Sequence, residues 1–299
     1  MPNLATAPQE RVLETTALTK NYGDLGALQE VSLNILPGVT ALLGQNGAGK
    51  TTLINCALGL EAPSSGTISV FGAPPNNRAS RQSVGVMLQD TELPDLLSSR
   101  ELLELFASYY HAPMTIEAVV ELAKIENFVD KRYRKLSGGQ KRRIQFALAI
   151  VGDPDLVFLD EPTTGLDIEA RKALWKVVRS FAKDGRSIIL STHYLEEADA
   201  LADRIVILAG GKIIADAGPQ ELRNSVAGAL IHCKTQLNTT TIETFPACIG
   251  AKLSNRITEI HTTHAPTTLR VLLQRDSGVQ ELTVTNPKLE DIFEQLTND

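Results

Sequence analysis

The chain has 299 residues, a formal net charge of −6 and 43% hydrophobic residues. This length and apolar content suit one medium-sized domain and a smaller one, each with a buried core. The acidic balance argues against a broad nucleic-acid-binding surface, and the three cysteines lack metal-ligand spacing and fit a reducing compartment.

The start of the chain has no feature of a targeting segment. Residues 1–10 are polar and contain proline, so we expect a flexible segment without a signal peptide. No later stretch has the ~18–20 apolar residues needed to span a bilayer. We therefore expect any membrane span that the protein needs to come from another chain.

A phosphate-binding loop is predicted at residues 44–52, which read Gly-Gln-Asn-Gly-Ala-Gly-Lys-Thr-Thr. The loop follows an apolar strand at 39–43 and precedes a helix, whose N-terminus carries partial positive charge. Its glycines let backbone N–H groups approach a triphosphate. Lys50 supplies a full charge for the β- and γ-phosphates, and Thr51 is the expected Mg²⁺ ligand. The expected nucleotide contacts are Gly44, Gln45, Asn46, Gly47, Ala48, Gly49, Lys50, Thr51 and Thr52.

A mostly helical stretch follows, with helices predicted at 100–110, 115–125 and 140–151. The third helix is preceded by Leu-Ser-Gly-Gly-Gln at residues 136–140, the signature segment. Ser137 is a good N-cap, and the free N–H groups at such a terminus can bind an anion. The signature segment therefore predicts a second phosphate site, about ninety residues after the first loop. Its expected contacts are Ser137, Gly138, Gly139 and Gln140.

Two acids end a predicted buried strand, residues 156–161, which read Leu-Val-Phe-Leu-Asp-Glu. Buried acids are costly in an apolar core, but they suit the carboxyl edge of a parallel sheet, where ligands bind. Asp160 is expected to hold Mg²⁺ through water. Glu161 is expected to orient and deprotonate the attacking water.

No nucleotide-binding motif occurs after Gly218-Pro219. Before that point we predict a helix at 168–184 and strands at 187–192, 205–208 and 212–215. Beyond it, alternation predicts strands at 229–235, 268–274 and 281–285. A last helix is predicted from Asn286-Pro287. Its apolar face would be formed by Leu289, Ile292, Phe293 and Leu296.

The phosphate loop and the signature segment together resemble the ATP-binding subunit of ATP-binding-cassette (ABC) transporters, over about residues 13–219. Within that family the chain is most similar to the stand-alone ATPases of bacterial type-2 exporters. The resemblance implies that Tyr22 stacks on adenine, that Gln89 senses Mg²⁺ and the permease, and that His193 contacts the γ-phosphate. It also implies that the loop ending at Asp167 crosses a dimer interface, where each signature segment closes on the ATP of the other subunit.

These assignments give one set of expected site residues. The expected catalytic residues are Glu161, His193, Gln89 and Lys50, and the expected metal ligands are Thr51, Gln89 and Asp160. The tail string Pro-Lys-Leu-Glu-Asp-Ile-Phe, residues 287–293, resembles the closing motif of type-2 exporter ATPases. The tail is shorter than theirs, so no regulatory role is carried over.

The predicted fold class is α/β: a P-loop NTPase (RecA-like) ABC nucleotide-binding domain with an inserted helical subdomain and a small α+β C-terminal extension. The ATP-binding domain would span residues 11–219, with the helical subdomain at about 91–155. A small C-terminal domain would span 220–299, either as a cover for the catalytic core or as a contact with a twin tail.

The predicted function is that of an ATP-hydrolysing subunit that binds ATP and Mg²⁺ in a homodimer. It would drive a separate integral membrane permease, for export, at the cytoplasmic face of the inner membrane, with no nucleic-acid partner. One alternative is a soluble ABC ATPase acting on the ribosome or DNA, and another is a non-hydrolysing nucleotide switch. A single cassette without a long coiled coil weighs against the first alternative. Intact Lys50, Asp160, Glu161 and His193 weigh against the second.

Overall fold

The structure, a computed structural model, describes residues 11–89, 91–183, 185–225, 228–285, 289, 292 and 293. The chain divides into two compact units, residues 1–217 and 218–299. The N-terminal segment predicted to be flexible, 1–10, lies outside the described residues. Within the described ranges, no helix is both long enough and apolar enough to cross a membrane.

The first unit is built around a six-stranded sheet in the order β5-β6-β7-β3-β8-β9. Its strands are β3 (Val39–Leu43), β5 (Val84–Met87), β6 (Leu156–Asp160), β7 (Ser187–Thr192), β8 (Arg204–Ala209) and β9 (Lys212–Ala217). All neighbours are parallel except β8 and β9, which form a hairpin. Every residue of β3, β6 and β7 is buried, because both faces of a parallel sheet are covered.

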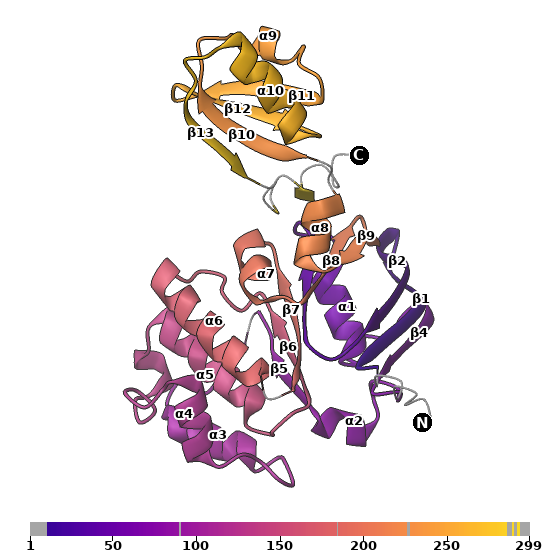
Figure 1. The fold of residues 1–299 in the computed structure, drawn as a ribbon. Coiled ribbons are helices and arrows are strands. Elements are labelled where there is room, and N and C mark those ends of the chain that lie inside the picture. The colour runs from indigo at the N-terminus through magenta and orange to yellow at the C-terminus, as the bar shows by residue number, and fades with distance from the viewer. Residues whose placement is uncertain are drawn as a thin grey trace, which may run out of the picture. The chain divides into compact units, whose positions relative to one another are not determined.

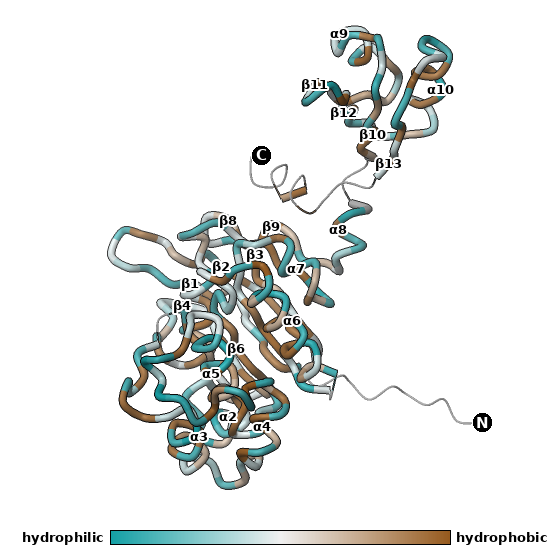
Figure 2. The backbone as a smooth tube through the Cα atoms, turned by 90° about the vertical axis from the view of Figure 1, so that its left-hand side faces the viewer, coloured by the Kyte–Doolittle hydropathy of each residue, from teal (hydrophilic) through white to brown (hydrophobic). Residues whose placement is uncertain are grey.

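A second, antiparallel sheet in this unit has the order β2-β1-β4. It consists of β1 (Leu13–Tyr22), β2 (Leu25–Ile35) and β4 (Ser65–Val70). Helix α1 (Lys50–Ala57) packs against strands of both sheets (Figure 1). Apolar residues of the two sheets and α1 form one buried cluster, and hydrophobic stretches follow the inner strands in Figure 2. The three strands of this antiparallel sheet were not predicted from the sequence.

Helices between β5 and β6 lie where the sequence predicted them. They are α3 (Ser99–Ala107), α4 (Ile116–Ala123) and α5 (Gly138–Ile150). The structure adds two short elements, the 3-10 turn η1 (Tyr133–Lys135) in the same stretch and α2 (Arg78–Gln82) before β5. Ser98, Thr115 and Ser137 cap the three longer helices through their hydroxyl groups. Helices α6 (Ile168–Ala182) and α7 (Leu195–Leu201) follow β6 and β7.

The second unit is α+β. Its sheet has the order β11-β12-β10-β13 and is antiparallel. The elements are α8 (Pro219–Ser225), β10 (Ala229–Lys234), α9 (Thr239–Ile242), β11 (Cys248–Ser254), β12 (Ile257–Thr262), α10 (Ala265–Arg275) and β13 (Gln280–Thr285). The side chains of Ile231, Ile260 and Leu272 are fully buried in its core. Of the predicted last helix, Leu289 and Ile292 are helical and buried, while Asn286, Pro287 and Leu296 lie outside the described residues.

One predicted strand is wrong. Residues 268–274 form part of helix α10, not a strand. Thr267, Thr268 and Val271 are β-branched and favour strands, but Pro266 lies in the first turn of the helix. Thr268 and Leu272, which are one helical turn apart, are both fully buried. Burial at the helical period therefore outweighs the local strand preference.

The separate core of the second unit leads to a stability prediction. Ile260→Ala removes buried methyl groups, which typically costs ~2–5 kcal/mol. The unfolding transition of residues 218–299 should move to lower temperature, whereas the ATP-stabilised transition of the first unit stays in place. Calorimetry with and without ATP distinguishes the two transitions. Leu253→Ala, at a position that is 64% exposed, is the control and should change neither. An equal shift of both transitions would contradict the prediction.

Candidate functional site

The loop between β3 and α1 needs its glycines for steric reasons. A Cβ on Gly44 would lie 2.5 Å from the Leu208 carbonyl oxygen. Gly49 has φ +104°, and a Cβ there would lie 2.5 Å from the Ala27 carbonyl oxygen. Gly47 has φ +83° with open space around it. The lack of a side chain therefore allows close backbone packing at Gly44 and Gly49 and leaves Gly47 accessible.

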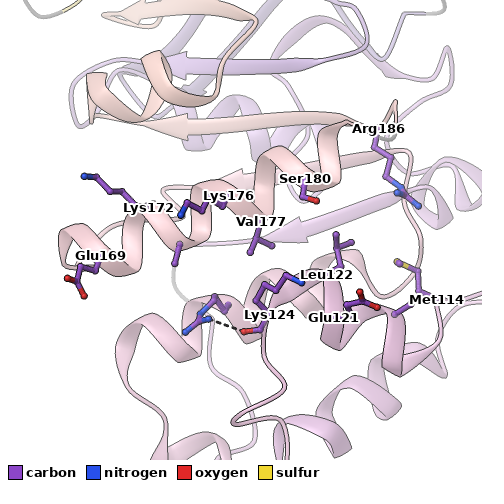
Figure 3. Close-up of a pocket in the computed structure, with 13 residues that line it drawn as sticks. Met114, Glu121, Leu122, Lys124, Glu169, Lys172, Lys176, Val177, Ser180 and Arg186 are labelled. Carbon is purple, nitrogen blue, oxygen red and sulfur yellow. Dashed lines mark hydrogen bonds between the residues drawn. The ribbon is translucent and has the colours of Figure 1, made fainter.

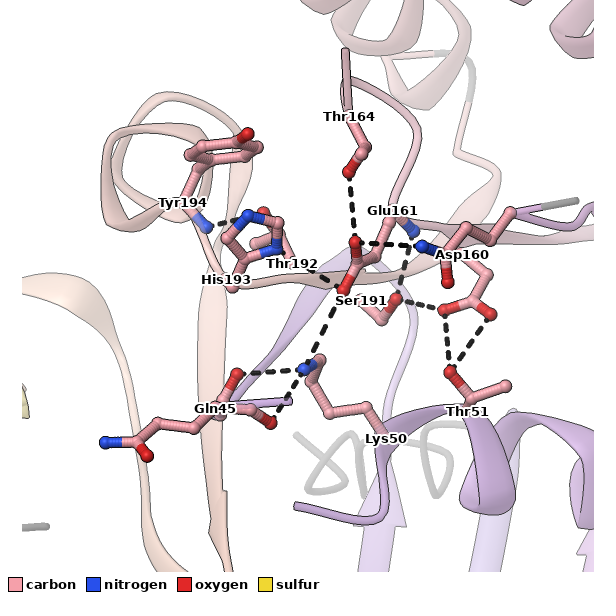
Figure 4. Close-up of polar contacts among 12 residues, drawn as sticks. Gln45, Lys50, Thr51, Asp160, Glu161, Thr164, Ser191, Thr192, His193 and Tyr194 are labelled. Carbon is pink, nitrogen blue, oxygen red and sulfur yellow. Dashed lines mark hydrogen bonds and ion pairs between the residues drawn. The ribbon is translucent and has the colours of Figure 1, made fainter. Parts of the chain in front are cut away.

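Lys50, the first residue of α1, folds its side chain back over this loop. Its ammonium donates to the carbonyl oxygens of Gly44 (2.8 Å) and Gln45 (3.2 Å), and the residue is only 5% exposed. Burial lowers the pKa of Lys50, and the negative charges of Glu161 and Asp160 oppose that shift. The loop thus contains a buried cation, which two of its own carbonyl oxygens hold in place (Figure 4).

The two acids lie at the carboxyl end of β6, as predicted. The Thr51 hydroxyl donates to the Asp160 carboxylate, at 3.2 and 3.4 Å from its two oxygens. The Ser191 hydroxyl, at the end of β7, also donates to Asp160. The backbone N–H of Glu161 is directed at the Ser191 carbonyl oxygen (3.1 Å) and hydroxyl oxygen (3.0 Å). Ser191 therefore holds both acids, a role that we did not predict from the sequence.

The Glu161 carboxylate lies close to the other three residues that were predicted to be catalytic. Thr164 donates to its Oε2 at 3.0 Å, and the Gln89 amide lies at 3.4 Å from the same oxygen. Its other oxygen, Oε1, lies 3.3 Å from His193 Nδ1 and 3.9 Å from Lys50 Nζ. One buried carboxylate thus brings together residues from four separate segments of the chain (Figure 4).

Thr51 and Asp160 offer adjacent oxygen atoms, which suit a Mg²⁺ ion. Mg²⁺ is usually held by one or two carboxylates or hydroxyls together with phosphates and water. Among the residues that the structure describes, no three His, Cys, Asp or Glu side chains gather to hold a metal by themselves. Gln89 makes its contact with Glu161, so the Thr51–Asp160 pair is the more direct metal position.

Tyr22, at the end of β1, lies beside the loop. Its ring is 44% exposed, its hydroxyl donates to Glu61, and Lys20 Nζ lies 5.0 Å from the ring centroid. A cavity of about 330 Å³ runs from this ring to Glu161. The residues lining it are Tyr22, Leu25, Ala27, Asn46, Gly47, Gly49, Lys50, Thr51, Thr52, Gln89 and Glu161.

The signature segment stands apart from this cavity. Ser137 caps α5: its hydroxyl accepts from the Gln140 N–H (3.3 Å), and the Gln140 side-chain oxygen accepts from the Ser137 N–H (3.0 Å). Asp167 caps α6 in the same way, accepting from the Ala170 N–H at 2.7 Å. None of residues 137–140 or Asp167 lines the cavity at the loop. The structure thus assembles one half of the predicted site and leaves these residues outside it.

A larger cavity lies elsewhere in the first unit, between α4, α5 and α6 (Figure 3). It has a volume of about 830 Å³, and its rim carries both basic residues such as Lys124 and Lys176 and acidic residues such as Glu121. None of the predicted site residues lines it. The predicted nucleotide-binding residues therefore line the smaller of these two cavities, not the larger one.

Comparison with known proteins gives the same family throughout. The family model for ABC transporters matches residues 28–164. The Nod factor export ATP-binding protein I of Rhizobium meliloti is 36% identical, over 95% of this chain and 88% of the relative. The protein of that name from Rhizobium etli is 34% identical, over 99% of this chain and 97% of the relative.

Solved structures agree with this result. The structure of an ATP-binding subunit of an ABC transporter is 28% identical, with a TM-score of 0.64, over 72% of this chain and 92% of that one. cbiO1 from Clostridium perfringens, part of the ABC transporter complex cbiONQ, is 31% identical, with a TM-score of 0.65, over 71% of this chain and 90% of that one. With its phosphate loop, paired acids and signature segment in one P-loop NTPase fold, this chain belongs to the ABC transporter family, as an ATP-binding subunit with ATPase activity.

Proposed function

We propose that the chain binds ATP with Mg²⁺ between two copies of itself and uses hydrolysis to drive a separate integral membrane permease, for export. The observation that carries this proposal is the Glu161 carboxylate, which lies between Lys50, Gln89 and His193 at the edge of the cavity. A base must be within reach of the water that it activates, and it must be close to the phosphates.

In this proposal each group has a distinct task. The backbone of residues 44–51 and the Lys50 ammonium hold the triphosphate, and Tyr22 stacks on adenine. Thr51 and Asp160 hold Mg²⁺, which neutralises charge on the phosphates. Glu161 orients the water and accepts its proton, while His193 contacts the γ-phosphate. Gln89 is hydrogen-bonded to Glu161 and would report the state of the site to the permease.

The position of the signature segment supports the proposed dimer. Residues 137–140 form a capped helix N-terminus that can bind phosphate, yet they do not line the cavity of their own loop. A second copy, related by a twofold axis, would bring this N-terminus to the ATP of the first. The position of Asp167 outside the same cavity supports an equivalent role at the interface.

The transport role draws on the relatives. Both rhizobial proteins are named for Nod factor export and match this chain over nearly its whole length, tail included. cbiO1 is described as part of a transporter complex. We therefore propose that the chain acts at the cytoplasmic face of the inner membrane, on a permease that forms the transport path.

The role of Glu161 gives the main test of the function. Glu161→Gln should keep ATP binding, because Thr51, Asp160 and Lys50 remain, but turnover should fall by ~10²–10⁴ as for other lost general bases. Phosphate release measures turnover, and size-exclusion chromatography should show an accumulating ATP-bound dimer. Glu104→Gln, on the exposed side of α3, is the matched control and should behave as the unmodified protein. Near-normal turnover by Glu161→Gln would remove this residue from the role.

The shared site predicts complementation between two inactive variants. Lys50→Ala damages the loop and Ser137→Arg damages the signature segment. In a mixed dimer both defects fall in one site and the other site is intact, so mixing the variants should restore roughly a quarter of the activity if sites act independently and subunits pair at random.

Each variant alone is the control, and ATPase rate against mixing ratio is the measurement. An isolated Ser137→Arg monomer should still bind ATP. Loss of ATP binding by that monomer, with no recovery on mixing, would place Ser137 at the ATP of its own chain.

A further inference from the structure

Helix α7 contains a buried carboxyl group that the roles assigned above do not use. Glu197 is 0% exposed. Its Oε1 accepts a hydrogen bond from the indole N–H of Trp175, on α6, at 2.9 Å. Its Oε2 is buried as well, with the Thr192 and Thr163 side chains nearby. A buried carboxyl costs stability relative to an apolar side chain of similar size, so stability alone does not account for it.

The groups around Glu197 belong to two segments that leave the active site. Thr192 is the last residue of β7, directly before His193, and Thr163 lies in the loop that leads from Glu161 to Asp167. Burial raises the pKa of Glu197, and the nearby Thr192, Trp175 and Thr163 side chains and the Arg171 charge partly offset that shift.

A second contact joins the same two helices. The His193 and Tyr194 rings are in contact at a tilt of 39°, with centroids 4.1 Å apart, and the Arg171 guanidinium lies 4.4 Å from the Tyr194 centroid. Arg171 and Trp175 are one turn apart on α6, which begins at Asp167. Tyr194 and Glu197 are at the start of α7, directly after His193. Arg171 also lies 3.9 Å from the Glu196 carboxylate, and Arg179 of α6 donates to the Ala200 carbonyl oxygen near the end of α7. The contacts of Arg171 and Trp175 are the ones at the start of α7, next to His193.

We propose that Glu197 is a positioning residue for ATP hydrolysis, which fixes α7 to α6 through Trp175 and so holds His193 beside Glu161. This inference rests on the proposed roles of His193 and Glu161. His193 Nδ1 lies 3.3 Å from Glu161 Oε1, a spacing that a small shift of α7 would change. Misplacement of a catalytic group by about 1 Å can cost ~10²-fold in rate.

Three variants separate positioning from simple packing. Glu197→Leu removes the acceptor, Trp175→Phe removes the donor but keeps a ring, and Glu197→Gln keeps an acceptor of the same length. Glu197→Leu and Trp175→Phe should each lower kcat by about 10- to 100-fold with little change in KM for ATP. Glu197→Gln should keep most of the activity. The double variant should be no worse than the poorer single one, because both remove the same contact.

Melting temperature supplies the readout that a structural role would move. Because burial raises the pKa of Glu197 in the folded state, the fold favours the protonated carboxyl over the ionised one. The stability that this preference contributes is lost as pH rises through the folded-state pKa. Glu197→Gln should therefore melt at the same temperature as the unmodified protein or higher, with an advantage that grows as pH rises. Glu197→Leu should likewise not melt earlier, although its kcat falls.

Two outcomes overturn the proposal. One is a Glu197→Leu variant with unchanged kcat. The other is a fall in kcat that is matched by an earlier melting transition in both Glu197→Leu and Trp175→Phe. A parallel His193→Ala variant separates this inference from the proposed function. If His193→Ala is inactive and Glu197→Leu is fully active, only the inference fails. If His193→Ala is fully active, the assigned role of His193 fails, and the positioning role fails with it.

Discussion

The backbone turn at Glu161 is the constraint on which the rest of the site depends. β6 ends at Asp160, and Glu161 takes φ 46°, a left-handed conformation that costs ~1–3 kcal/mol for a residue with a side chain. The Ser191 carbonyl and hydroxyl oxygens both face the Glu161 N–H, which holds the turn in place. A strand that simply continued would direct the two acids to opposite faces of the sheet. The turn instead puts Asp160 beside Thr51 and Glu161 beside Lys50.

Parallel strand pairing explains why distant segments meet at this turn. β6, β7 and β3 are neighbours in the sheet, with Asp160 opposite Ser191 and Leu43 opposite Thr192. The loop that follows β3, the acids that end β6 and the histidine that follows β7 must therefore leave the sheet at the same edge. The three strands are wholly buried, so their register is fixed by the core. The sheet therefore sets where these side chains lie, and their hydrogen bonds set how they are oriented.

Elements with a clear local pattern could be predicted from the sequence. The helical pattern of residues 100–110 and 115–125, the Ser137 cap and the apolar run at 156–159 predicted α3, α4, α5 and β6 to within a few residues. The sequence was not sufficient where tertiary neighbours decide. Ser191 is one of six buried residues in β7, and nothing local marks it as the anchor of both acids. Glu197 looks like a surface acid in Leu-Glu-Glu-Ala-Asp until Trp175 is seen beside it. In α10, β-branched residues hid a helical pattern that only burial exposes.

The helix that carries the signature segment is also joined to Glu161, the proposed base, within one chain. Arg142, on the second turn of α5, donates to the Gln89 carbonyl oxygen at 3.0 Å, and the Gln89 amide in turn lies 3.4 Å from Glu161. Ser137 caps the N-terminus of the same helix. In the proposed dimer, that N-terminus faces the ATP of the other subunit, whereas Arg142 acts on Gln89 of its own chain. A displacement of α5 caused by one nucleotide would therefore reach the base that acts on the other. In the proposed dimer, α5 would therefore be the element through which the two sites influence each other.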